Sequence, residues 1–304
     1  MSTRIAGILR SLAEMIREDR YFAAGFITIS VVIILSAAAS IISTYDPYKI
    51  DLINKLRGPS PEHPMGTDQL GRDLFTRILY GGRYTLFLSA SAIALALVIG
   101  LLVGTLSGYY KGWLDLVVQR FVDILMSFPS IILAIALATM LGYGLETLVI
   151  AVAIAESPFL IRVVRAAVIS IRDLPYIEAA RLMGYGDLYV ILRHVIPNIM
   201  YVVIPQVTLQ MGSAILIIAA LGFLGIGIKP PTPEWGSMLN EARAYLMDYP
   251  HLLIFPGLMI FLSIVSFNIV GEPKSRSLIR GRSRLVWGLY RGGRRGLDER
   301  NTSY

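Results

Sequence analysis

The sequence has no cysteine and few histidines, and these absences exclude several kinds of chemistry. None of the 304 residues is a cysteine, so disulfide bonds, thiolate metal sites and cysteine nucleophiles are excluded. The three histidines, His63, His194 and His251, lie far apart in the chain, whereas a closed metal site needs several ligands together. We therefore expect this chain to bind no metal and no cofactor.

Charge is also scarce. Charged residues make up 16% of the chain and hydrophobic residues 55%, whereas soluble domains carry about 25% charged residues. The apolar residues form uninterrupted blocks, and six of these blocks are long enough to cross a bilayer as helices. The sequence thus predicts an all-α polytopic membrane protein, with spans at residues 21–42, 84–109, 121–140, 148–164, 198–224 and 252–270.

The first apolar block follows several arginines and resembles a signal peptide near Ala37-Ala38-Ala39. The apolar region of a signal peptide has only about 7–15 residues. Residues 21–42 are long enough to cross the membrane, so we predict a retained first helix.

Lysine and arginine positions predict the orientation. The segments 1–20, 110–120, 162–194 and 271–304 hold 20 of the 28 lysines and arginines. Such residues gather on the cytoplasmic side of membrane proteins, so both termini are predicted to lie inside. The net charge of +7 follows from this bias, and we expect no nucleic-acid partner. The basic tail 271–304 either lies against anionic membrane lipid or is solvated.

Enzymatic motifs are absent. The sequence has no G-x-x-x-x-G-K-[ST] phosphate loop, no H-E-x-x-H metal motif and no G-x-S-x-G nucleophile elbow. The first pattern binds the phosphates of ATP, and the second binds the zinc ion of metalloproteases. The third places a serine nucleophile on a sharp strand-to-helix turn. We predict that the chain is not an enzyme.

The loop between the fourth and fifth spans has its own helix signals. Asp173 is a good N-cap, Pro175 suits a first helical turn, and Gly184 is a natural left-handed C-cap. A second short helix is predicted at residues 187–194. Ile177, Ala180 and Gly184 share one side of the first helix, where their small size would admit a partner surface. A surface helix without a partner would show the same pattern.

This loop resembles the EAA signature of ABC importer permeases. The matching residues are Glu178, Ala179, Ala180 and Gly184, followed by Pro197. The resemblance implies that the loop forms a coupling helix that fits a groove on an ATP-binding subunit. It also implies that these residues supply the contact and turn positions, with Pro197 setting the start of the fifth helix.

Further stretches are similar to the C-type permeases of the dipeptide, oligopeptide and nickel family. They are His63–Asp73, Gly108–Tyr110, Phe128-Pro129 and Gly225–Gly236. The resemblance covers about residues 60–270. It implies an ABC type I importer permease in the cell inner membrane, which imports peptides by alternating access. The implied partners are a second homologous permease, two ATP-binding subunits that hold ATP and Mg²⁺, and an extracytoplasmic solute-binding protein.

The predicted organisation follows from the spans and the resemblance. Residues 1–20 form a cytoplasmic N-terminus, 21–42 the first transmembrane helix and 43–83 an extracytoplasmic segment. Residues 84–270 form a five-helix permease core with the coupling loop at 171–197, and 271–304 form the basic cytoplasmic tail.

Two acids lie within the predicted spans. Asp123 is close enough to Arg120 for a local ion pair. Glu156 stands where related permeases often have a neutral residue, and intramembrane acids are expensive. Glu156 therefore lines the translocation path, or it pairs with Arg162 or with a partner subunit.

The cargo and the class of transporter have alternatives. The same machinery serves nickel complexes or oligosaccharides in related permeases. An ATP-independent secondary transporter would show internal repeats, and none is evident. A purely structural subunit would leave the loop at Glu178 unexplained. Gly100, Gly104 and Gly108 of the second span either admit a neighbouring helix closely or reflect the general frequency of glycine in membrane helices.

Overall fold

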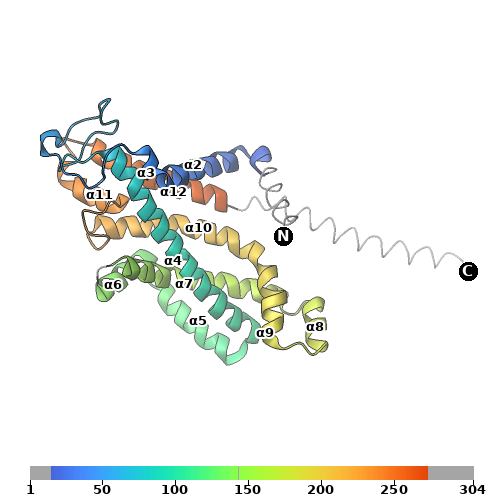
Figure 1. Cartoon of the computed structure of the whole chain (residues 1–304). Coiled ribbons are helices and arrows are strands. Elements are labelled where there is room, and N and C mark those ends of the chain that lie inside the picture. The colour runs from blue at the N-terminus through green and yellow to red at the C-terminus, as the bar shows by residue number, and fades with distance from the viewer. Residues whose placement is uncertain (1–14, 143, 273–304) are drawn as a thin grey trace, which may run out of the picture. The chain divides into compact units, whose positions relative to one another are not determined.

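The computed structural model describes residues 15–142 and 144–272, and the chain in these ranges is built from helices (Figure 1). Apart from one isolated bridge between Thr67 and Asp73, the described residues form no β-structure. Residues 1–14 and 273–304, which include most of the predicted N-terminus and basic tail, lie outside the described residues.

Five helices are long and apolar enough to cross a membrane, and they confirm five of the six predicted spans. They are α2 (Arg20–Ala37), α4 (Leu74–Tyr110), α7 (Leu145–Ile171), α10 (Ile196–Phe223) and α12 (His251–Gly271). Helix α4 begins earlier than predicted because the Asp73 carboxylate caps it, accepting from the backbone N–H of Thr76 at 2.8 Å. A count of apolar residues does not detect such a polar first turn.

The third predicted span is broken. Residues 121–140 belong to two helices, α5 (Gly112–Met126) and α6 (Ser130–Leu141), bent by 91° to each other. Pro129 lies at the break with extended backbone angles, φ −55° and ψ 133°. Proline lacks the N–H needed to continue α5 and disfavours a helical residue before it. If the bent pair counts as one span, six spans are present in the described residues, and the third is sharply bent at Pro129.

Glycines bring α4 and α7 into close contact. A Cβ atom added to Gly100 would lie 2.9 Å from the Cβ of Leu160, and one on Gly104 would lie 2.6 Å from the carbonyl oxygen of Ile161. One on Gly108 would lie 2.9 Å from the carbonyl oxygen of Arg165. Between the two explanations for these glycines, the structure therefore supports close helix packing.

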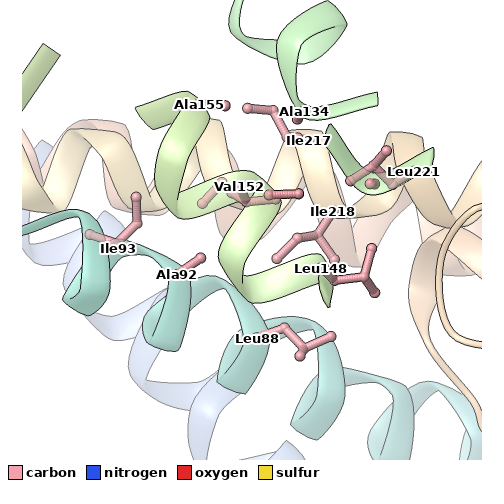
Figure 2. Close-up of a cluster of buried hydrophobic side chains, with 13 residues drawn as sticks. Leu88, Ala92, Ile93, Ala134, Leu148, Val152, Ala155, Ile217, Ile218 and Leu221 are labelled. Atoms are coloured by element: carbon pink, nitrogen blue, oxygen red, sulfur yellow. The ribbon is translucent and has the colours of Figure 1, made fainter. Parts of the chain in front are cut away.

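A buried apolar cluster joins four helices (Figure 2). Leu88 and Ala92 come from α4, Leu148 and Val152 from α7, and Ile217 and Ile218 from α10; Ala134 adds α6 to the cluster. Although α6 is separated from α5 by a sharp bend, its small residues keep it against α7 and α10.

Short helical segments also lie in or next to the two loops that the charge bias places on the outer side of the membrane. Helix α3 (Ala39–Ile42) lies at the end of the first predicted span, and the 3₁₀ turn Leu52–Asn54 lies in the loop that follows it. The second loop contains α11 (Trp235–Ala242) and the 3₁₀ turn Arg243–Tyr245. The indole Nε1 of Trp235, which is fully buried, donates to the carbonyl oxygen of Ile78 at 2.9 Å. This bond fixes α11 to the first turns of α4.

Buried charges hold the same two loops together. Arg72 pairs with Asp68 at 2.6 Å and with Glu241 at 2.7 Å, and Arg77 lies 3.3 Å from Glu241. The side chains of both arginines are at most 2% exposed. The segment around the start of α4 thus packs against α11.

Candidate coupling loop and intramembrane polar cluster

The predicted coupling helix is present as α8 (Pro175–Leu182). Pro175 is its first residue, as predicted, but its N-cap is Leu174, without a side-chain cap. Asp173 is therefore not the cap. Its carboxylate instead accepts from Arg172 Nε at 2.8 Å and Lys111 Nζ at 3.4 Å, and these cations lower the pKa of Asp173. The carboxylate ties the end of α7 to the turn between α4 and α5.

The end of α8 matches the prediction for Gly184. This residue has φ +85°, in the left-handed region, and its N–H donates to the Arg181 carbonyl at 2.9 Å. The N–H of Tyr185 reaches the Ala180 carbonyl at 3.4 Å, which completes a Schellman cap. A Cβ atom on Gly184 would meet nothing within 4 Å, so the constraint here comes from backbone conformation alone.

The face of α8 that looked suited to a partner is occupied within the chain. Ile177 is 0% exposed and Ala180 is 1% exposed, because both pack in a cluster with Val168 and Ile171 of α7. Of the two alternatives for this face, the packing of Ile177 and Ala180 within the chain argues against docking of a partner at these two residues. The opposite face is free: Glu178 and Ala179 are exposed.

Large apolar side chains are exposed around that free face. They are Leu174, Tyr176, Leu182, Met183, Tyr185, Leu188, Tyr189 and Leu192. Leu182 is 83% exposed and Met183 is 67% exposed. Exposed apolar patches of this kind mark interaction sites. We call residues 174–192 the coupling surface.

The second short helix is not separate from the fifth span. Helix α9 (Asp187–Val190) continues through a π-helical turn (Ile191–Val195) into α10, giving a 37-residue helix from Asp187 to Phe223. Pro197 lies in the first turn of α10, and the preceding π turn changes the hydrogen-bond register where its N–H is missing. The end of the coupling surface, from Asp187 onward, and the fifth span therefore form one continuous helix, about 55 Å long at 1.5 Å per residue.

Tyr109 connects this loop to α4, and the sequence analysis gave it no such role. Its side chain is buried at the end of α4, and its hydroxyl donates to Asp187 Oδ1 at 2.8 Å. Arg181 Nε donates to the same hydroxyl at 3.1 Å, and the Arg181 guanidinium lies 4.7 Å from the ring centroid. The backbone carbonyl of Tyr109 accepts from Arg172. One residue thus contacts α7's end, α8 and α9.

Glu156 lies near the middle of α7 and is 3% exposed. Its carboxylate accepts from Gln210 Nε2 at 2.5 Å and from Ser213 Oγ at 2.9 Å, both on α10. The predicted pairing with Arg162 is wrong, because Arg162 binds Asp123 at 2.6 Å. The predicted pairing of Asp123 with Arg120 is wrong for the same reason.

Groups of three or more histidines, aspartates or glutamates that could hold a metal ion do not occur in the described part of the chain. The polar groups that do lie together, around Tyr109 and around Glu156, are suited to binding other protein groups or a small polar solute.

Comparisons with known proteins agree with this arrangement. The model of the family described as "Binding-protein-dependent transport system inner membrane component" matches residues 74–272. The chain is 40% identical to a dipeptide transport system permease protein of Alkalihalophilus pseudofirmus, over 86% of each chain. It is 42% identical to a glutathione transport system permease protein of Escherichia coli O157:H7, over 79% of this chain and 80% of that protein.

A solved structure of a transporter shares the fold. It is a chain from inward-facing conformations of the MetNI methionine ABC transporter, with a TM-score of 0.55 and 20% identity, and the match covers 66% of this chain and 95% of that one. The helices of this match confirm the predicted all-α importer permease fold.

Proposed function

The chain belongs to the family of binding-protein-dependent transport system inner membrane components, and on that premise we propose that it is a permease subunit that imports dipeptides or oligopeptides. Members of this family are multi-pass proteins of the inner membrane that work with ATPase and solute-binding proteins. The substrate class is supported by two relatives, one named for dipeptides and one for glutathione, which is itself a peptide.

The observation that carries the proposal is the coupling surface. It combines the EAA residues Glu178 and Ala179 with exposed apolar side chains such as Leu182 and Met183. We propose that an ATP-binding subunit, which holds ATP and Mg²⁺, contacts this free face of α8. The opposite face, with Ala180, is the attachment of α8 to its own chain.

The contacts of Tyr109 suggest how the movement is transmitted. A force on α8 reaches α4 through Arg181 and Tyr109, and it reaches α10 through Asp187, because α9 and α10 are continuous. Gly184 sets the angle between α8 and α9. Closure of two ATP-binding subunits would then act on both α4 and α10, and alternating access follows if solute binds the two states with different affinity.

The proposed assembly contains a second homologous permease, with the solute path between the two chains, and a solute-binding protein at the outer loops. Six spans in one chain rarely enclose a path for a peptide. The nickel and oligosaccharide alternatives need the same assembly, so the substrate assay below decides among the three.

Substitution of Met183 by Glu tests the docking face. We expect the complex purified through a tag on the ATP-binding subunit to lose this permease, because a charge would enter an apolar contact. Met247→Glu is the matched control. Met247 is 90% exposed and lies in the predicted outer loop before α12, so this substitution should leave assembly with the ATP-binding subunit intact. Equal recovery of both variants would contradict the proposed docking face.

Uptake by the reconstituted complex tests the substrate class. Proteoliposomes with ATP inside should accumulate a labelled dipeptide when the binding protein is added, and they should not accumulate nickel or a trisaccharide. Accumulation of nickel or sugar without peptide would refute the peptide assignment while leaving the permease assignment in place.

A further inference from the structure

The break between α5 and α6 is exposed on the surface of the chain. Ser127, Phe128 and Pro129 form the break, and all three are exposed. Non-helical backbone is tolerated inside a bilayer only where protein covers it or where it borders water. This face therefore does not lie against lipid hydrocarbon, and in the assembled transporter it borders partner protein or the solute path.

Polar side chains line the neighbouring part of α10. Gln206, Gln210 and Ser213 are half-buried and spaced at four and three residues, so they share one side of the helix. Gln210 and Ser213 reach Glu156 on α7, and Ser130, the first residue of α6, also interacts with that carboxyl group. The polar stripe, the break and Glu156 thus meet in one place.

Glu156 differs from the other acids in the surrounding helices. Asp123 pairs with Arg162 at 2.6 Å, and Asp115 pairs with Arg165 at 2.5 Å. Among the ion pairs of residues 15–142 and 144–272, none includes Glu156. A buried carboxylate in a membrane is costly and is ordinarily matched by a cation. No described residue therefore supplies a cation to Glu156.

We propose that Glu156 and Gln210 form a site within the membrane that receives the amino-terminal ammonium group of a peptide during translocation. The proposal rests on the proposed function and identifies the part of the substrate that this chain reads. An ammonium group has three donors and no acceptor. Gln210 donates to Glu156 through Nε2, and its amide oxygen is a further acceptor on the same side chain.

The chemistry also fits a carrier of many peptides. Peptide side chains vary, whereas the amino terminus is common to all peptides with a free end. A site that reads the ammonium group accepts varied sequences with one carboxylate. Ser213 and Ser130 hold that carboxylate in place, and they are not required to touch the substrate.

Glu156→Gln in the complete reconstituted transporter is the test. Glutamine has the same shape and can keep the contacts to Gln210 and Ser213, while it removes the charge. We expect the apparent KM for uptake of Ala-Ala to rise at least about tenfold, the effect of about 1.4 kcal/mol of lost attraction. Glu156→Asp should recover part of the loss. Glu146→Gln, the same change at an exposed position in the first turn of α7, should leave uptake unchanged.

Uptake of the desamino analogue of the dipeptide separates the remaining explanations. The analogue is supplied at a concentration that saturates the binding protein. Its uptake should be no worse in Glu156→Gln than in the unmodified transporter, because it has no ammonium group. Equal loss for both substrates would overturn the proposal and assign Glu156 to a cation of the second permease. Loss together with a lower melting temperature, or no loss of Ala-Ala uptake, would overturn it as well. An unmodified transporter that takes up no peptide would refute the proposed function instead.

Discussion

Removal of one hydroxyl group, by Tyr109→Phe, should uncouple ATP hydrolysis from uptake. The substitution keeps the ring, its packing among Val168 and Ile177, and its contact with the Arg181 guanidinium. It removes two hydrogen bonds, to Asp187 at 2.8 Å and from Arg181 at 3.1 Å. These are two of the side-chain links between the end of α4 and the coupling surface, where the Tyr110 side chain also interacts with Asp187.

The size of the effect follows from those two bonds. A hydrogen bond to a charged group contributes about 1.5–3 kcal/mol when it is buried. Asp187 is exposed, so water can replace the lost phenol and each of the two bonds contributes about 1 kcal/mol, less than that range. A total of about 2 kcal/mol would shift the population of the linked arrangement roughly 30-fold. The transporter should then hydrolyse several times more ATP per peptide imported.

The assay compares the two rates in one preparation. Phosphate release and labelled dipeptide uptake are measured in the same proteoliposomes, and the ratio is the coupling. Tyr245→Phe is the matched control, because it removes a hydroxyl from the predicted outer loop between α10 and α12. An unchanged ratio in Tyr109→Phe would refute the idea that Tyr109 transmits the movement of α8. A fall in both rates together would indicate loss of assembly.

Two further predictions concern the outer loops. Glu241→Ala should lower the free energy of unfolding by about 3 kcal/mol, because it leaves the buried arginines Arg72 and Arg77 without one of their acidic partners. In thermal melts, Glu241→Gln should lower the melting temperature less than Glu241→Ala does. Equal melting temperatures for Glu241→Ala and wild type would contradict this. Burial raises the pKa of Glu234 above its usual 4.5, even though it accepts from the N–H groups of Gly236 and Ser237. The folded state therefore holds this proton more tightly, so this contribution is fully present below pH 4.5 and is lost as pH rises through the raised pKa. Melts from pH 4 upward should fall less steeply for Glu234→Gln than for wild type, and parallel curves would count against the shift.

Local signals in the sequence predicted much of the fold because the bilayer imposes a simple rule. Long apolar runs must be helices, and five of them are. The conformation at Gly184 was also predictable, because a left-handed C-cap favours glycine. Pro129 lies in an apolar run that length alone marks as a span; the proline signals an interruption there, whereas the angle of the bend depends on the packing of α6 against α7 and α10.

The errors in the coupling loop have a common cause, which is that one face of α8 cannot be told from the other without its neighbours. Ile177 and Ala180 looked available because they are apolar and small, yet the same properties suit them to packing on α7. Tyr109 was missed because its partners, Arg181 and Asp187, lie more than 70 positions away in the chain. Arg162 was misassigned for the same reason, since sequence distance favoured Glu156 over Asp123.

The proposed ammonium site and the proposed transmission of movement from α8 both involve helix α10. Glycines hold α4 and α7 so closely that these two helices must move as one body. Helix α10 is joined to α7 at Glu156 by hydrogen bonds from Gln210 and Ser213, and it is continuous with α9 at the coupling surface. Movement of α8 and α9 relative to α4 would therefore change the contact between Glu156 and Gln210. If an ammonium group binds that contact, its affinity must differ between the two arrangements. This difference is what couples a ligand to a conformational change, so Glu156→Gln should also reduce stimulation of ATP hydrolysis by the loaded binding protein.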